Sequence, residues 1–257
     1  MNFLTEVTLS SAEHIYEDFD RARVLYPFWK NYPPQQRGRA PRGTSTPWGE
    51  VGEKVVGLSL TRAIAEQAPD IRYPGLPLGG DIRFSTRDAI IHFDIKSTGP
   101  NDNANEIVAS PHQISGDGKE WLNNGIKNSP VTIKGRRSTM NFQPELPPFY
   151  YEADVLLCLT YFVKVVYKVQ EIGYQPLEYL EIVCVPNGLF MFDGPDWNAS
   201  VRELLIPGKD DAAVTKKRTR VRLNPLASIA NWRCKKIEKQ LSGWQVTNRS
   251  PSRIING

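Results

Sequence analysis

Cysteine and histidine are scarce in this chain, which contains three of each among its 257 residues. Cys158, Cys184 and Cys234 stand far apart, so they form no C-x₂-C pair and no even-numbered disulfide framework. The histidines are equally scattered. The sequence therefore gives no support to a zinc site, an HNH-type nuclease centre or a disulfide-rich secreted fold.

Long apolar runs are also missing. The first twenty residues have neither the basic start nor the apolar core of a signal peptide, and no run is long enough to span a bilayer. We expect a cytoplasmic protein with no membrane partner. The net charge of +4 is mild, and 40% hydrophobic residues is ordinary for a globular chain. We expect a single domain over residues 1–243 and a polar tail over 244–257 that frays.

The most informative stretch, residues 79–100, predicts a β-hairpin. Two strand-like runs, 82–86 and 89–96, flank a tight turn at Arg87-Asp88. In such a hairpin the numbers of paired residues sum to 175, which sets Asp81 opposite Asp94 with Cβ atoms about 5 Å apart. Because side chains alternate along a strand, Lys96 joins the two acids on one face.

Two carboxylates held this close repel each other unless a cation lies between them. Mg²⁺ fits, since it prefers oxygen ligands and uses only one or two protein carboxylates. Asp81, Asp94 and the carbonyl of Ile95 are the candidate ligands, and Lys96 would orient a water. This is the PD-(D/E)xK nuclease pattern, although spacing alone equally permits an exposed hairpin with a cross-strand salt bridge. A second Asp-x-Lys, Asp117-Gly118-Lys119, lies between glycines and is interpreted as a loop.

The remaining pattern predicts an α/β fold, with a mixed sheet of five or six strands flanked by helices. Helices are expected over 10–26 and 50–67 and strands over 153–169 and 177–186, followed by a closing helix over 228–241. The polar segment 97–139 is expected to be a long loop. Glu53 on the second helix is more often solvated than catalytic, and His112 is more often a surface histidine than a ligand contact.

Two basic segments point to nucleic acid. Arg37, Arg39 and Arg42 lie in a loop rich in proline and glycine, which is either solvated or in contact with phosphates. In residues 209–223, Lys216, Arg218, Arg220 and Arg222 recur at every second position. That alternation fits either a charged edge strand or a β-ribbon that reads bases in the DNA major groove. In the second case Arg218 is expected to contact the DNA backbone.

Several blocks together resemble one family, the BglI-type type II restriction endonucleases. They include YPFWKNYPP (26–34), GLPLGGDIR (75–83), FDIKSTGPND (93–102), SPHQISGDG (110–118) and PGKDD…RVRL (207–223). The similarity spans most of residues 20–224. The chain after Asn224 has no counterpart in this resemblance.

The resemblance implies a restriction-endonuclease-like fold with a β-ribbon for DNA reading. It implies Asp81, Asp94 and Lys96 as the active site, and Lys209, Asp211, Arg220 and Arg222 as base-reading residues, with Asp102 as a further acid near the DNA. It also implies a homodimer on double-stranded DNA, Mg²⁺ with Mn²⁺ as a substitute, and 3′ overhangs at an interrupted palindrome of two GCC half-sites. It allows for a DNA methyltransferase that acts on the same site.

Two other classes of protein stay open. A structure-selective repair or recombination nuclease of the same fold would need the phosphate contacts but not the set from Lys209 to Arg222. A non-catalytic DNA-binding protein would keep the basic strand but would have no use for two acids and a lysine on one face. Cleavage of a sequenced DNA separates these alternatives.

Overall fold

Strand β2 (Ala89–Thr98), which carries the candidate acid and lysine, lies between β1 and β7 in a seven-stranded sheet. The structure is a computed structural model, and it describes residues 1–21, 46–73, 81–121, 130–133, 136–139, 144–151, 153–168, 176–191, 204–207 and 218–250. The expected arginine loop with Arg37, Arg39 and Arg42 lies outside these residues.

The main sheet has the order β1-β2-β7-β8-β11-β12, and β6 pairs with the start of β7. Its strands are β1 (Ile82–Ser85), β2, β6 (Phe149–Tyr151), β7 (Val155–Tyr167), β8 (Leu177–Val185), β11 (Cys234–Gln240) and β12 (Gly243–Asn248). Strands β2 and β7 run parallel and all other pairs of this sheet are antiparallel. The expected mixed α/β fold is confirmed, with more strands than the five or six predicted.

A smaller three-stranded sheet has the order β3-β10-β9, from β3 (Glu106–Ala109), β10 (Thr219–Arg222) and β9 (Leu205–Pro207). This sheet helps to decide between the edge strand and the base-reading ribbon that were considered for residues 209–223. Strand β10 is hydrogen-bonded on both sides, so the edge-strand interpretation is wrong. Its residues alternate between buried and partly exposed, with Arg220 and Arg222 on the more exposed face. A further two-stranded sheet pairs β4 (Pro130–Ile133) with β5 (Arg136–Thr139).

The segment 97–139 was expected to be a loop, and this is wrong. It contains β3, β4 and β5, the 3₁₀ turn η3 (Pro111–Gln113) and the short helix α4 (Gly118–Glu120). Each element is only three or four residues long, and β3 pairs with β10, more than a hundred residues later. Local sequence pattern does not reveal a strand whose partner is that distant.

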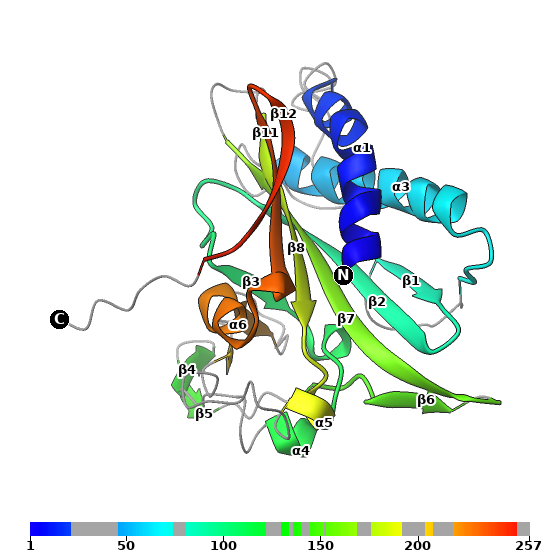
Figure 1. Ribbon diagram of the computed structural model, residues 1–257. Helices are drawn as coiled ribbons and strands as arrows, with labels where there is room; N and C mark the ends of the chain where they lie inside the picture. Colours follow the sequence, from blue (N-terminus) through cyan, green and yellow to red (C-terminus); the bar gives the residue numbers. More distant parts are fainter. Residues whose placement is uncertain are drawn as a thin grey trace, which may run out of the picture.

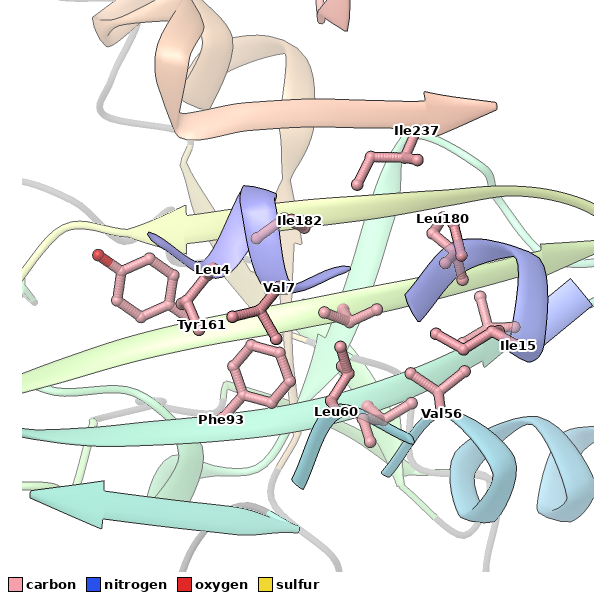
Figure 2. Packing of buried hydrophobic residues seen from close by; sticks show 14 of the residues in the cluster. Leu4, Val7, Ile15, Val56, Leu60, Phe93, Tyr161, Leu180, Ile182 and Ile237 are labelled. Carbon is pink, nitrogen blue, oxygen red and sulfur yellow. The ribbon is translucent and has the colours of Figure 1, made fainter. Parts of the chain in front are cut away.

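Hydrophobic side chains cover both faces of the main sheet. Helices α1 (Asn2–Arg21) and α3 (Thr46–Gln67) pack on one face, where Phe93 and Ile95 of β2 point. The small sheet and α6 (Leu223–Ile229) cover the other, where Phe162 of β7 points. Figure 1 shows α1 and α3 together on one side of the sheet. Figure 2 shows side chains from these helices and from β2, β7, β8 and β11 meeting in the core between helices and sheet. Two short helical segments, α5 (Gly188–Met191) and η6 (Asn231–Arg233), complete the described elements.

The predicted helix over 10–26 begins earlier, at Asn2. The hydroxyls of Thr5, Thr8 and Ser11 each donate to the carbonyl four residues before them. These bonds satisfy the polar side chains inside the helix, so neither Ser10 nor Ser11 is its N-cap. The second helix is confirmed and begins at Thr46; the apolar side chain of Leu58 on it is 75% exposed.

The closing helix expected over 228–241 is wrong from Ala230 onward, because residues 234–240 form strand β11 beside β8. The expected fraying of the tail is also wrong as far as Asn248. Residues 243–248 form β12, which is paired with β11 along its length. The C-terminal segment therefore extends the main sheet.

Candidate active site

The predicted register of the β1–β2 hairpin is confirmed. Ile82 lies opposite Phe93 and Arg83 opposite His92, so each pair sums to 175. Asp81 comes immediately before β1, and its Oδ2 accepts a hydrogen bond of 2.8 Å from the backbone N–H of Ile95. The first acid is therefore fixed to the strand that carries Asp94 and Lys96, on the face away from α1 and α3.

Asp94 is buried, with a side chain only 5% exposed, and its Oδ2 forms an ion pair with the ammonium of Lys96. Burial raises the pKa of Asp94 to about 6, and the nearby charge of Asp81 pushes in the same direction. Lys96 and a hydrogen bond from Gln113 lower this pKa but do not cancel the effect of burial. Burial thus disfavours the ionised form of this carboxyl.

Gln113 is a contact of Asp94 that sequence reasoning missed. Its side-chain nitrogen donates to Oδ1 of Asp94, and its oxygen accepts a 2.8 Å bond from the backbone of Ser110. A signal was present: Ser110 and Gln113 form a capping box around the 3₁₀ turn η3, the S-x-x-Q pattern. That pattern predicts a turn but does not say that the turn packs against β2.

The residues at this site fit a hard divalent cation. Asp81 and Asp94 would supply carboxylate oxygens and Ile95 a carbonyl, which is a donor set of the kind that Mg²⁺ accepts. Burial raises the pKa of Asp94 and the charge of Asp81 adds to the effect, so a cation beside both carboxylates would favour their ionised forms. Among the described residues there is no cluster of three or more His, Cys, Asp or Glu side chains placed to hold a metal. Two carboxylates are what a magnesium site with several waters would use.

An open cavity of about 450 Å³ adjoins the hairpin. Its lining joins Lys96 of β2 to Asp102 in the following turn, to Arg220 of β10 and to Arg218, which immediately precedes β10. Arg218 is exposed, and Arg220 lies 3.6 Å from a carboxylate oxygen of Glu106. Asp102 accepts a 2.8 Å bond from the N–H of Gly99. The fold therefore brings an element of the predicted cleavage site and three of the predicted DNA contacts to one hollow.

The other predicted site residues lie in different parts of the fold. Arg222 lies on β10 opposite Glu106 and two residues from Arg220, whereas Lys209 and Asp211 fall outside the residues that the structure describes. Glu53 is exposed on α3, which covers the opposite face of the sheet from Asp94. His112 forms an ion pair of 2.9 Å with Glu145 at the surface.

The second Asp-x-Lys is separate from the site. Oδ1 of Asp117 accepts from the backbone nitrogens of Lys119 and Glu120 at 2.7 and 3.2 Å, which makes Asp117 the N-cap of α4. Its carboxylate is used to start a helical turn.

In the described part of the chain, no helix is long and apolar enough to cross a membrane.

Comparison with known proteins identifies the class to which this fold and site belong. A crystal structure of the restriction endonuclease BglI bound to its DNA recognition sequence matches with a TM-score of 0.71 and 33% identity, over 92% of this chain and 87% of that one. The tetrameric restriction endonuclease SfiI bound to cognate DNA matches with a TM-score of 0.55 and 12% identity, which shows a shared fold. The fold is that of type II restriction endonucleases.

The sequence comparisons give the family. The model of the restriction endonuclease BglI family matches residues 1–237. The type II restriction enzyme BglI of Bacillus subtilis is 38% identical over 255 residues, covering 89% of this chain and 85% of that protein. The chain belongs to the BglI restriction endonuclease family and is a type II restriction endonuclease.

Proposed function

We propose that this enzyme makes Mg²⁺-dependent double-strand cuts at an interrupted GC-rich palindrome, two GCC half-sites around unspecified bases, and leaves 3′ overhangs. The observation that carries the proposal is the convergence of Asp81, Asp94 and Lys96 on one hairpin, beside a cavity that also holds Arg220. The relative with a DNA-bound structure supports double-stranded DNA as the substrate.

Four residues carry the proposed chemistry. Asp81, Asp94 and the carbonyl of Ile95 would hold the divalent cation, which would supply positive charge for the phosphate and the leaving oxygen. The ammonium of Lys96, which adjoins Asp94, orients a water for in-line attack on phosphorus. The 2.8 Å bond from the Ile95 N–H to Asp81 keeps the first acid beside the strand before the cation binds. Mn²⁺ is expected to substitute for Mg²⁺.

The DNA contacts divide into reading and positioning groups. Arg220 and Arg222, with Lys209, Asp211 and Asp102, are proposed to read base edges, because arginine donates two hydrogen bonds to guanine and aspartate accepts from cytosine. Arg37, Arg39, Arg42 and Arg218 are proposed to contact phosphates, which fix register without reading sequence. A homodimer would place one site on each strand, and its two-fold axis would impose a palindrome.

The first experiment is digestion of a long sequenced DNA with Mg²⁺, followed by sequencing of the fragment ends. Ends at an interrupted GCC/GGC palindrome with 3′ overhangs are expected. Ends at another palindrome would contradict the assignment of the base-reading residues. Cleavage at branched or damaged structures without sequence preference would favour a structure-selective nuclease. Specific retention of DNA without cleavage in Mg²⁺ or Mn²⁺ would favour a non-catalytic binder.

The active site is tested with Asp94→Ala, which is expected to abolish cleavage and to leave specific binding measurable. Asp88→Ala is the matched control, because Asp88 lies at the exposed turn of the same hairpin. Cleavage by the Asp94 variant at the rate of the control would show that the site lies elsewhere.

Base reading is tested with Arg220→Ala. The expected cost is about 1–3 kcal/mol, concentrated at one base position. Arg62→Ala is the control, since Arg62 pairs with Glu66 on the exposed side of α3. An equal loss on every sequence would make Arg220 a phosphate contact.

A further inference from the structure

A second charged cluster is buried on the same face of the main sheet as Asp94. It contains Lys164 of β7, Glu181 of β8 and Arg249, which follows β12. Lys164 lies opposite Lys96 in the β2–β7 register and opposite Glu181 in the β7–β8 register. Lys164 is 0% and Glu181 1% exposed, so both charges need partners inside the protein.

Arg249 is the partner of Glu181. Its Nε and Nη2 donate to the two carboxylate oxygens of Glu181 at 2.7 and 2.8 Å. A bidentate pair of this kind is short, strong and directional. The backbone N–H of Arg249 also donates to the carbonyl of Cys234 at 2.9 Å, which fixes the end of the β11–β12 hairpin. The guanidinium is therefore held in one place and orientation.

The remaining donors of the cluster hold the loop of residues 103–106. Nη1 of Arg249 donates to Oδ1 of Asn105 at 2.9 Å. Nζ of Lys164 donates to the carbonyls of Asn103 and Glu106 at 3.2 and 3.0 Å, and both cations reach the carbonyl of Ala104. Two cations thus neutralise one acid and use their spare donors on the backbone and one side chain of this loop.

The position of this loop sets the position of the proposed reading residues. It follows Asp102 directly and leads into β3, where Glu106 lies opposite Arg222 and 3.6 Å from Arg220. At the end of β10, the N–H of Leu223 donates to the carbonyl of Asn105 at 2.9 Å. A shift of the loop would therefore move both arginines relative to Lys96.

We propose that Arg249, anchored on buried Glu181, is a positioning residue for sequence recognition, and that it holds the 103–106 loop so that Arg220 and Arg222 face the DNA in one register. This inference rests on the proposed function of the cavity. Arg249 lies beyond the residues 1–237 that the family model matches, so the anchor comes from a C-terminal segment outside that model. None of these hydrogen bonds of Arg249 reaches Asp81, Asp94 or Lys96.

The expected kinetic signature follows from that separation. Greater mobility of the 103–106 loop should weaken DNA binding and reduce discrimination between DNA sequences. Asp81, Asp94 and Lys96 should keep their arrangement. KM should rise and site discrimination should fall by roughly tenfold or more. The kcat on the preferred site should stay within about threefold of wild type.

The test compares three full-length variants. Arg249→Met removes both the ion pair and the loop contacts. Because Arg249→Met removes the bidentate partner of buried Glu181, Asn105→Ala is tested beside it. That change removes only the hydrogen bond from Nη1 to the side chain of exposed Asn105. Lys239→Met is the control: Lys239 forms an ion pair of 2.7 Å with Glu13, on the same β11–β12 hairpin but toward α1.

Each variant is assayed for KM and kcat on a duplex carrying the site found by digestion and on duplexes that differ from it by one base pair. Raised KM and lower discrimination in Arg249→Met and Asn105→Ala, with Lys239→Met unchanged, support the proposal. Unchanged discrimination in both, an equal loss in Lys239→Met, or a fall in kcat alone would overturn it.

Amide hydrogen exchange gives a readout that needs no DNA. Arg249→Met should speed exchange across residues 99–106 and leave the β1–β2 hairpin unchanged. Unchanged exchange in that loop would refute the anchor even if DNA binding were altered. Conversely, if wild type failed to cleave DNA, the proposed function would fail while the exchange result would still decide whether Arg249 holds the loop.

Discussion

Replacing the candidate metal ligand Asp94 by asparagine should stabilise the metal-free protein at neutral pH. Asparagine has nearly the shape of a protonated aspartic acid, so the variant reports the cost of ionising this carboxyl in the fold. Burial raises the pKa of Asp94 from 3.8 to about 6. A difference of about 2 units, at roughly 1.4 kcal/mol per unit, gives about 3 kcal/mol. The side chain is only 5% exposed, so solvent screening reduces this figure little.

The sign follows from proton binding. Between pH 3.8 and about 6 the folded protein keeps the Asp94 proton that the unfolded chain has released. Wild-type stability therefore falls as the pH rises through this window, and the full cost is present above pH 6. Asp94→Asn removes this cost, so its advantage should be about 3 kcal/mol at pH 7.5 and about 1 kcal/mol at pH 4.5.

The assay is urea unfolding in EDTA at these two pH values, with wild type and Asp94→Asn side by side. Asp88→Asn is the control, because the Asp88 side chain is 89% exposed at the turn of the same hairpin. It should change stability by less than about 0.5 kcal/mol. A variant that is no more stable than wild type at pH 7.5, or that gains equally at both pH values, would refute the reasoning.

Three further predictions concern the scaffold. In Gly188→Ala the new Cβ would lie 2.1 Å from Nε1 of buried Trp121, so urea unfolding should show a loss of about 1–3 kcal/mol or more; full stability would contradict this packing. Burial, with the charge of Arg83, lowers the pKa of His92 to about 4, so wild type should lose up to about 3 kcal/mol as the pH falls from 6.5 to 4. The His92→Asn variant should lose less stability over that pH range. Parallel stability profiles for wild type and variant would show that His92 does not cause the loss. Phe19 of α1 is buried in the core, so Phe19→Ala should lower stability by about 3–5 kcal/mol. The side chain of Leu58 is 75% exposed, so Leu58→Ala should change stability by less than about 0.5 kcal/mol. Similar losses in the two variants would be inconsistent with these two environments.

The β1–β2 hairpin was predictable because its information is local. A two-residue turn fixes the register of both strands, and the alternation of side chains then places Asp81, Asp94 and Lys96. The contact of Gln113 with Asp94 was not predictable, because it joins two segments through the path of an intervening loop. A sequence gives the residues of such a contact but not the path that brings them together.

Strand β11 shows why periodicity failed at the C-terminus. Cys234 and Ile237 are three residues apart, a spacing typical of one helix face. In the strand they point to opposite sides, and both are buried because Cys234 belongs to the core under α6 and Ile237 to the core under α1. A strand covered on both faces loses its period of two, so only its pairing with β8 decides its structure.

The chain order of the sheet has a consequence for synthesis on the ribosome. The candidate acids occur within the first hundred residues, but β2 needs β7, whose last residue is Tyr167, to complete its hydrogen bonds. The loop of residues 103–106 gains its last contacts only after Glu181 and then Arg249 have been added. A nascent chain thus carries the candidate cleavage residues well before it carries the residue that we infer aligns the reading surface. Chains that have not yet reached Arg249 would lack that alignment.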